Sequence, residues 1–400
     1  MTAASADPGT PTDPAPRPIR LCVMATVDIT IQNLCRGRLE YLIARGFEVT
    51  VVCAPTPMAD EIRRRGVRLF TPPLTRAMTP WTDIKCLWVL WRFFRRERFD
   101  IVEVSTPKAA LLGVIAARLA RQPCVVHLLR GLAYQRQRGL GAKILRWSQR
   151  IACRRAHHVM SISRSMAEQA YRDGLCASGS MILMGRGSSN GVDLERFSPG
   201  LRVRRAELRQ GLGIAPDAVV VGFVGRMTAD KGLVELMDAF EGVARRHPEA
   251  VLLFVGDYEE RDRPPSAVME RIDRVPFVRR AGWQADTAPY YGVMDVLALP
   301  SYREGFGAGL LEAAAAGVPV IASDIEGCRD AVDGGVTGLL VPAQDARALE
   351  AALERLVSDA GLRARMGAAG RAWAEQHFDQ QVIWRMYEEH YRRFVESAAN

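Results

Sequence analysis

The chain has 400 residues, of which 48% are hydrophobic and 25% charged, and its formal net charge is +9. That length suits two domains of ordinary size, each with its own core. No apolar run approaches the length that crosses a bilayer, which disfavours an integral membrane protein. Residues 1–18 are rich in Pro, Ala, Asp and Thr and lack an apolar segment, so we expect a disordered tail, no signal peptide and a cytoplasmic location.

The charge is divided unevenly between the two halves. Residues 1–200 hold 30 Lys and Arg against 15 Asp and Glu, a balance of +15, whereas residues 201–400 hold 24 against 30, a balance of −6. The basic half favours an anionic partner, which could be a nucleic acid, an acidic membrane face or a phosphorylated substrate. A generally arginine-rich surface is the alternative. The eight cysteines form no C-x-x-C pair, so we expect reduced, buried thiols.

Strand and helix patterns alternate from Ile19 onward. Strands are predicted over residues 19–26, 47–54, 67–73, 100–105, 124–129, 157–163 and 181–185, and helices over residues 34–44, 82–96, 109–121 and 143–155. This order predicts parallel strands joined by crossover helices, and therefore a doubly wound domain over residues 19–198.

A polar segment punctuated by Gly and Pro, residues 187–200, is the predicted domain boundary. Beyond it, strands are predicted over residues 218–225, 250–256, 277–282, 295–300, 318–323 and 338–342, and helices over residues 204–210, 233–246, 268–274, 345–357 and 361–377. A second doubly wound domain is thus expected over residues 199–378, and a C-terminal helix in residues 379–400 that packs back on the first domain. The prediction is an α/β protein in which two Rossmann-like domains face a central cleft at the carboxyl ends of their strands.

The segment Leu299–Ser323 combines an open turn with two acids. It reads as a strand end, a glycine-rich turn, a short helix and a second strand. The turn lets a ligand approach the backbone, and the helix N-terminus favours a phosphate. Glu304 before the helix and Glu312 on it could bind a sugar and a ribose on either side of that phosphate. The pattern predicts a nucleotide-sugar site; an ordinary strand, loop and helix with solvated glutamates is the alternative.

Two cations, Arg226 and Lys231, follow the first strand of the second domain in the sequence FVGRMTADKGL. At a crevice they would neutralise a diphosphate, most strongly as charge develops on a leaving phosphate. Solvated cations at a helix start are the alternative, which the helix dipole disfavours.

These motifs resemble the donor site of retaining glycosyltransferases of family 4, which have the two-domain GT-B fold. The densest match is REGFGAGLLEAAAAGVPVIAS, and the resemblance extends over residues 19–395. NGVDLERFSP, residues 190–199, is also typical of the family. GRGSS, TPKAALLG and RGLAYQ, which begin at residues 185, 106 and 130, indicate its branch devoted to bacterial surface polysaccharides.

The resemblance implies roles for individual residues. Arg226 and Lys231 would bind the donor phosphates and, together with Glu304 at the donor sugar, are the predicted catalytic residues. Glu312 would bind the ribose, and the Ala281–Gly282 backbone would receive the base. The full set of predicted donor-binding residues is Gly225, Gly282, Phe306, Gly307, Gly309, Leu310 and Glu312. Arg130 and Asn190 are predicted to contact the acceptor or a phosphate.

Two positions depart from the family pattern. The turn after the first strand reads TVDITIQN where many members have paired glycines, which leaves phosphate contact from the first domain open. Arg130 stands before Gly131 where many members have a histidine. An arginine cannot serve as a base, but it could bind an acceptor phosphate or the leaving group. A surface arginine at a strand end is the alternative.

Motifs of other chemistries are missing. The chain contains no D-x-D, H-E-x-x-H or Walker sequence, which argues against metal-dependent transfer, zinc hydrolysis and a P-loop. We therefore expect neither a cofactor nor a metal, with Arg226, Lys231 and the helix terminus in place of the cation.

Residues 83–99, DIKCLWVLWRFFRRERF, join aromatic and basic side chains on one helix. Such a helix suits the headgroup region of an anionic membrane. The alternative is a helix that covers the sheet and has a basic outer face.

The sequence thus predicts a metal-independent, retaining hexosyltransferase. It would transfer a sugar from UDP-N-acetylhexosamine or UDP-hexose to a hydroxyl of a lipid-linked saccharide, in the cytoplasm or on the inner face of the membrane. With no evident protein base, the acceptor proton would pass to the departing phosphate. The alternatives are transfer to a natural-product acceptor and a sugar-nucleotide epimerase or hydrolase. A nucleic-acid-binding protein is disfavoured because no strand carries clustered aromatics.

Overall fold

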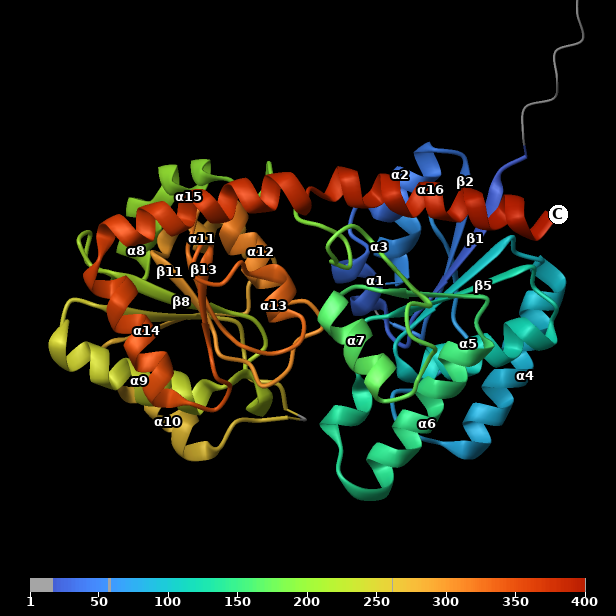
Figure 1. Ribbon diagram of the computed structural model, residues 1–400, viewed down its shortest axis with the longest axis horizontal. Coiled ribbons are helices and arrows are strands. Elements are labelled where there is room, and N and C mark those ends of the chain that lie inside the picture. The colour runs from blue at the N-terminus through green and yellow to red at the C-terminus, as the bar shows by residue number, and fades with distance from the viewer. Residues whose placement is uncertain (1–16, 57–58, 261, 400) are drawn as a thin grey trace, which may run out of the picture.

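The computed structural model describes residues 17–56, 59–260 and 262–399. They form two α/β domains that lie side by side (Figure 1). Residues 1–16 of the predicted tail lie outside the described residues. Arg17 forms an ion pair with Asp100 at 2.8 Å, so the described chain makes its first contact just before β1.

The first domain is built on a seven-stranded parallel sheet with the order β3-β2-β1-β4-β5-β6-β7. Its strands are β1 Ile19–Met24, β2 Phe47–Val52, β3 Arg68–Phe70, β4 Ile101–Ser105, β5 Cys124–Leu129, β6 His158–Ser161 and β7 Met181–Leu183. The order reverses between β1 and β4, which pair with Leu21 opposite Ile101. Helices cover both faces, so the central strands β4 and β5 are buried and mostly apolar, with Glu103, Ser105 and His127 as their buried polar residues.

The helices of this domain differ in part from those predicted. They are α1 Asp28–Leu34, α2 Arg38–Ala44, α3 Ala59–Arg64, α4 Pro80–Glu97, α5 Pro107–Leu119, α6 Gly139–Arg155 and α7 Arg164–Arg172, with a 3-10 turn, η1, at Ala133–Arg136. The predicted helix over residues 34–44 was wrong at its start, because α1 and α2 are separate and most of TVDITIQN is helical. The helical conformation is interrupted before α2 at Gly37, against which the Trp384 ring packs.

The second domain is built on a six-stranded parallel sheet with the order β10-β9-β8-β11-β12-β13. Its strands are β8 Val220–Val224, β9 Val251–Val255, β10 Val278–Gly282, β11 Val296–Leu299, β12 Val320–Ser323 and β13 Gly338–Val341. The helices are α8 Arg205–Gly211, α9 Leu233–Arg246, α10 Ser266–Arg274, α11 Ala288–Val293, α12 Ala308–Ala315, α13 Cys328–Ala331, α14 Ala346–Ser358 and α15 Ala360–His377, with 3-10 turns η2 Pro199–Arg204 and η3 Ala229–Lys231. Here the order reverses between β8 and β11, and ligands bind at such a switch point.

The last helix, α16 Gln380–Ala399, leaves the second domain and runs across the first (Figure 1). Its Tyr391 hydroxyl donates a hydrogen bond to Glu103 of β4. Glu103 also accepts from Arg38 at 3.0 Å, and the side chains of both are fully buried. The Arg38 guanidinium lies 4.1 Å from the centre of the Tyr387 ring. The end of the chain therefore completes the core of the first domain.

Candidate functional site

The loop after β8 lies against the end of β11. At Gly232, with φ of 67°, an added Cβ would lie 2.0 Å from the Pro300 carbonyl oxygen, so a glycine is required for this close approach. The approach places Lys231 Nζ 2.5 Å from Glu304 Oε1. The Ser301 hydroxyl donates to the same carboxylate oxygen at 2.8 Å. Two predicted catalytic residues are thus in direct contact.

Arg226, the third predicted catalytic residue, is more open to solvent. Its guanidinium pairs with Glu259 at 2.8 Å, and its side chain is 62% exposed. Close by, Arg303 forms an ion pair with Asp230, whose carboxylate also accepts from the Thr228 hydroxyl at 2.6 Å. The loops that follow β8 and β11 are therefore joined by two ion pairs.

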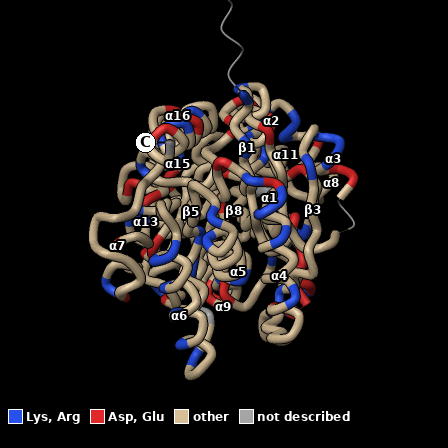
Figure 2. Tube along the Cα trace, turned by 90° about the vertical axis from the view of Figure 1, so that its right-hand side faces the viewer, with Lys and Arg blue, Asp and Glu red and all other residues tan. Residues whose placement is uncertain are grey.

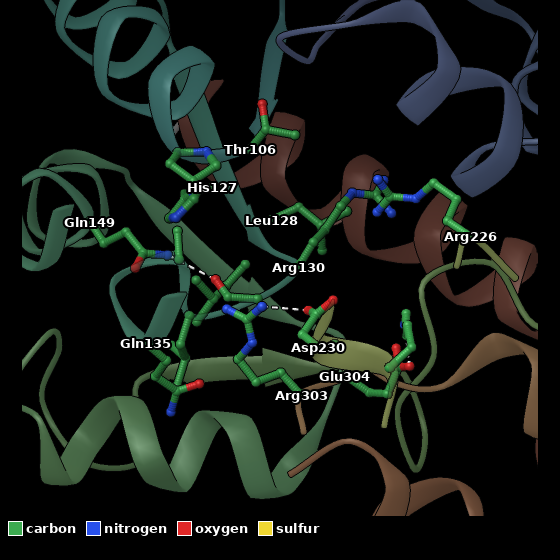
Figure 3. Close-up of a pocket in the computed structure, with 17 residues that line it drawn as sticks. Thr106, His127, Leu128, Arg130, Gln135, Gln149, Arg226, Asp230, Arg303 and Glu304 are labelled. Atoms are coloured by element: carbon green, nitrogen blue, oxygen red, sulfur yellow. Dashed lines mark hydrogen bonds and ion pairs between the residues drawn. The ribbon is translucent and has the colours of Figure 1, made fainter. Parts of the chain in front are cut away.

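Two cavities lie in the cleft between the domains. The first has a volume of about 370 Å³ and includes Arg226, Lys231 and Glu304 in its lining. Its opposite wall comes from the ends of β4 and β5 and from α6 of the first domain. Figure 3 shows His127 and Gln149 on one side of this cavity and Arg226 and Glu304 on the other.

The second cavity, of about 530 Å³, is lined by three of the seven predicted donor-binding residues, Phe306, Gly307 and Glu312. Its lining includes Arg226, Glu304, Phe306, Gly307, Glu312, Arg130 and Asn190. Glu312 is half-buried and accepts a hydrogen bond from the Tyr291 hydroxyl at 2.6 Å. Burial raises the pKa of Glu312 above its usual value, although the Tyr291 bond and nearby Arg196 and Arg36 oppose this rise.

The backbone of Arg130 in the first domain lies against Gly305 of the second domain at the cleft. An added Cβ on Gly305 would lie 2.4 Å from the Arg130 carbonyl oxygen, so a side chain at 305 would push the domains apart. The Arg130 side chain is only 7% exposed and lies 4.0 Å from Glu103. It also donates to the Ser189 hydroxyl. The alternative of a surface arginine is wrong, because this guanidinium joins the buried charges of the first domain.

Asn190 connects the cleft to α16. Its side-chain amide donates to the Arg36 carbonyl at 2.8 Å and accepts from the Trp384 indole at 2.9 Å. These bonds occupy one donor and one acceptor position of its amide, so Asn190 fixes the cavity edge.

Four predicted donor-binding residues do not line either cavity: Gly225, Gly282, Gly309 and Leu310. The Leu310 side chain is buried, and its backbone N–H donates to the Gly307 carbonyl at 2.8 Å. The Gly282 carbonyl accepts from Gly256 at 2.8 Å at the end of β10. Their predicted roles in donor binding stay predictions.

Sequence reasoning missed several polar residues of the cleft. Arg36 and Arg196 line the second cavity, and His127 and Gln149 line the first. Arg196 lies within NGVDLERFSP, so the motif contained a signal for it. Arg36 follows the unpredicted helix α1, and the other two sit in a buried strand and on a helix, where no motif marks them.

Helix α4 has two distinct faces. Cys86, Leu90 and Phe94 are buried against the sheet, so the helix does cover it, whereas Trp81 is 85% and Trp88 54% exposed. None of the described helices is long and apolar enough to span a membrane. Among the described residues, no three His, Cys, Asp or Glu side chains cluster as metal ligands. Metal independence stays a prediction.

The chain is similar to known proteins along most of its length. Residues 31–180 match the family described as Glycosyl transferase 4-like domain, and residues 204–373 match Glycosyl transferases group 1. The capsular polysaccharide biosynthesis glycosyltransferase CapM of Staphylococcus aureus is 29% identical over 365 residues, which is 91% of this chain and 95% of that protein. An Escherichia coli UDP-Gal:alpha-D-GlcNAc-diphosphoundecaprenol alpha-1,3-galactosyltransferase is 27% identical over 82% of this chain and 85% of that protein.

The fold is also similar to solved structures. Anabaena Alr3699/HepE, solved in complex with UDP, matches with a TM-score of 0.75 over 94% of this chain and 100% of that chain, at 22% identity. The similarity covers both domains and the cleft between them.

Proposed function

The chain is a glycosyltransferase with the GT-B fold, belonging with the 4-like and group 1 families that its two domains match, and we propose on this premise that it is a retaining hexosyltransferase of surface-polysaccharide synthesis. The predicted family and fold are confirmed by these matches. The proposed donor is UDP-N-acetylhexosamine or UDP-hexose, and the acceptor is a hydroxyl of a saccharide on a polyprenyl diphosphate.

The main support for the proposal is that two cationic side chains and one carboxylate lie together in the cleft. Arg226 and Glu304 line both cavities, and Lys231 contacts Glu304 at 2.5 Å. A diphosphate bound here is neutralised by the two cations, and Glu304 accepts hydrogen bonds from sugar hydroxyls. The cations act most strongly on the charge that grows on the leaving phosphate.

The proposed mechanism needs no metal and no protein base. The acceptor oxygen attacks the anomeric carbon on the face that the phosphate leaves. Its proton passes to the departing phosphate oxygen, so the new bond has the anomeric configuration of the donor. Arg226 and Lys231 stabilise that phosphate while the bond to the sugar breaks.

A lipid-linked acceptor is supported by the name of the Escherichia coli relative, which gives a diphosphoundecaprenol-linked sugar as its acceptor, and by the surface of the first domain. In the view of Figure 2, α4 and α6 lie on either side of α5 at the lower edge of the molecule. Both carry exposed aromatics: Trp81 on α4 is 85% exposed and Trp147 on α6 is 64% exposed. Arg92 lies 4.8 Å from the Trp88 ring. Tryptophan beside arginine is suited to the headgroups of an anionic membrane, which is the membrane contact that we propose.

A mass-spectrometric screen tests the function. The purified protein is incubated with a set of nucleotide-sugars, alone and with short-chain prenyl diphosphates that carry N-acetylglucosamine, N-acetylgalactosamine or glucose. We expect one extended prenyl diphosphate and release of UDP that depends on it. Consumption of the donor at the same rate without any acceptor would instead identify an epimerase or hydrolase. Transfer only to a small-molecule natural product would replace the lipid-linked acceptor.

A further inference from the structure

Two residues that line the first cavity each have a buried acceptor atom without a hydrogen-bond partner. The atoms are Nε2 of His127 and Oε1 of Gln149, and neither is bonded to any residue that the structure describes. His127 is 2% exposed and Gln149 is 3% exposed. Both residues line the cavity that Lys231 and Glu304 close from the other domain (Figure 3).

The imidazole of His127 is neutral and presents a lone pair at Nε2. Its Nδ1 lies 3.3 Å from the Val104 carbonyl oxygen, which can only accept, so Nδ1 carries the proton. Burial lowers the pKa of His127 to about 4. At neutral pH the second ring nitrogen is therefore an acceptor.

The amide of Gln149 is oriented in the same way. Its Nε2 donates to the Gly131 carbonyl at 2.8 Å. With the nitrogen fixed by this bond, the other atom of the amide is the oxygen, which is also an acceptor.

Buried polar atoms are almost always paired in native proteins, and leaving one unpaired costs about 1–3 kcal/mol. Two such acceptors beside one cavity suit a ligand that brings two donors. Neighbouring hydroxyls of a sugar ring supply two O–H donors, whereas a phosphate or carboxylate supplies none. The cavity, at about 370 Å³, lies within the size range of small-molecule sites.

We propose that His127 and Gln149 form a subsite that binds two hydroxyls of the acceptor sugar and so fixes which further hydroxyl faces the donor. The inference rests on the proposed function and deepens it. The subsite belongs to the first domain, whereas the predicted phosphate-binding cations belong to the second. Loss of the subsite therefore weakens acceptor binding and leaves donor binding intact.

The test uses the best acceptor of the prenyl diphosphate panel together with its monodeoxy forms. His127→Leu and Gln149→Met each remove one acceptor atom at little cost in volume. We expect each variant to raise the acceptor KM about tenfold or more, as the loss of one such bond does. The Kd for the donor stays unchanged. Gln210→Met, an exposed glutamine on α8, is the matched control and retains the KM of the unaltered protein.

The deoxy acceptors separate recognition from a structural role. With the unaltered protein, we expect two of the monodeoxy acceptors to have a higher KM than the full acceptor. In the variant that lacks the side chain bound by the missing hydroxyl, that deoxy acceptor and the full acceptor should have the same KM. If no single hydroxyl matters to the unaltered protein, the subsite is overturned even where a variant fails to fold. If both variants keep the KM of the unaltered protein for the full acceptor, the subsite is overturned while the proposed function stands. If the unaltered protein extends no acceptor of the panel, both fail together.

Discussion

Lys231 and Glu304 lie 73 residues apart in the chain, yet Nζ of the first is 2.5 Å from Oε1 of the second. The side chains are 17% and 14% exposed, so the pair is shielded from bulk solvent. A shielded cation remains effective toward a phosphate because water screens it less. The same contact holds the carboxylate of Glu304 at the position where the donor sugar is proposed to bind.

The variant Lys231→Ala tests whether this cation acts on the reaction. We expect kcat to fall by roughly 10²–10³, as when one preorganised partner of a developing anion is removed, while the Kd for the donor changes far less. Steady-state kinetics and calorimetric titration with the donor measure the two quantities. Arg245→Ala removes an exposed cation from α9 and serves as the control. Equal losses in kcat and in donor affinity would show that Lys231 binds the donor without acting on the reaction.

The buried pair of Arg38 and Glu103 makes a prediction about stability. Arg38→Met leaves the Glu103 carboxylate buried without its closest cation, and we expect a loss of about 3–5 kcal/mol in the free energy of unfolding. Adding Glu103→Gln removes the stranded charge and recovers part of that loss. Urea denaturation followed by circular dichroism measures both. Arg63→Met breaks an exposed pair with Asp60 and costs less than about 1 kcal/mol; a similar small loss for Arg38→Met would contradict the prediction.

The pH dependence of stability tests the burial of His127. Its native pKa of about 4 lies below the usual 6.5, so between these pH values the unfolded chain binds a proton there that the native protein does not. Native stability therefore falls as pH falls from 6.5 to 4, by up to about 3 kcal/mol from this residue. His127→Leu lacks this contribution. Its stability relative to the unaltered protein should rise as the pH is lowered through that window, and a constant difference would show that His127 is not buried.

Vesicle sedimentation tests the proposed membrane face. We expect the unaltered protein to bind vesicles that contain phosphatidylglycerol, and to bind less as salt is raised. Replacing Trp81 and Trp147 by serine should weaken binding about tenfold, because both rings would leave the interface. Trp283→Ser removes a tryptophan that is 70% exposed on the second domain and should change nothing. If Trp283→Ser weakened vesicle binding as much as the change at Trp81 and Trp147, the surface of α4 and α6 would not be the membrane-binding face.

The sequence was informative where local pattern and structure coincide. The parallel sheets follow from alternating apolar runs and helical segments, and α9 was predicted with its observed limits, Leu233–Arg246. The short helices α3, α7 and α11 were missed because six to nine residues give too few turns for a clear apolar face. The split between α1 and α2 depends on Trp384, which no local pattern near residue 37 reveals.

At the site, too, residues within local motifs could be predicted, whereas residues whose role depends on distant contacts could not. Glycine-rich turns and charges in motifs pointed to Arg226, Lys231, Glu304 and Glu312, and the structure places all four at the cleft. Arg130 could not be placed from sequence because its burial depends on Glu103 and Ser189, which are distant in the chain. In the sequence, His127 cannot be distinguished from other polar residues of buried strands. Its proposed role depends on the unpaired Nε2, which only the three-dimensional structure reveals.

A crystal structure of the protein with the nucleotide-sugar that the screen identifies tests whether Arg226, Lys231 and Glu304 bind the donor. We expect the diphosphate in the cleft, within hydrogen-bond distance of the Arg226 and Lys231 side chains, and a sugar hydroxyl bonded to Glu304. A diphosphate bound away from these three side chains would contradict this expectation.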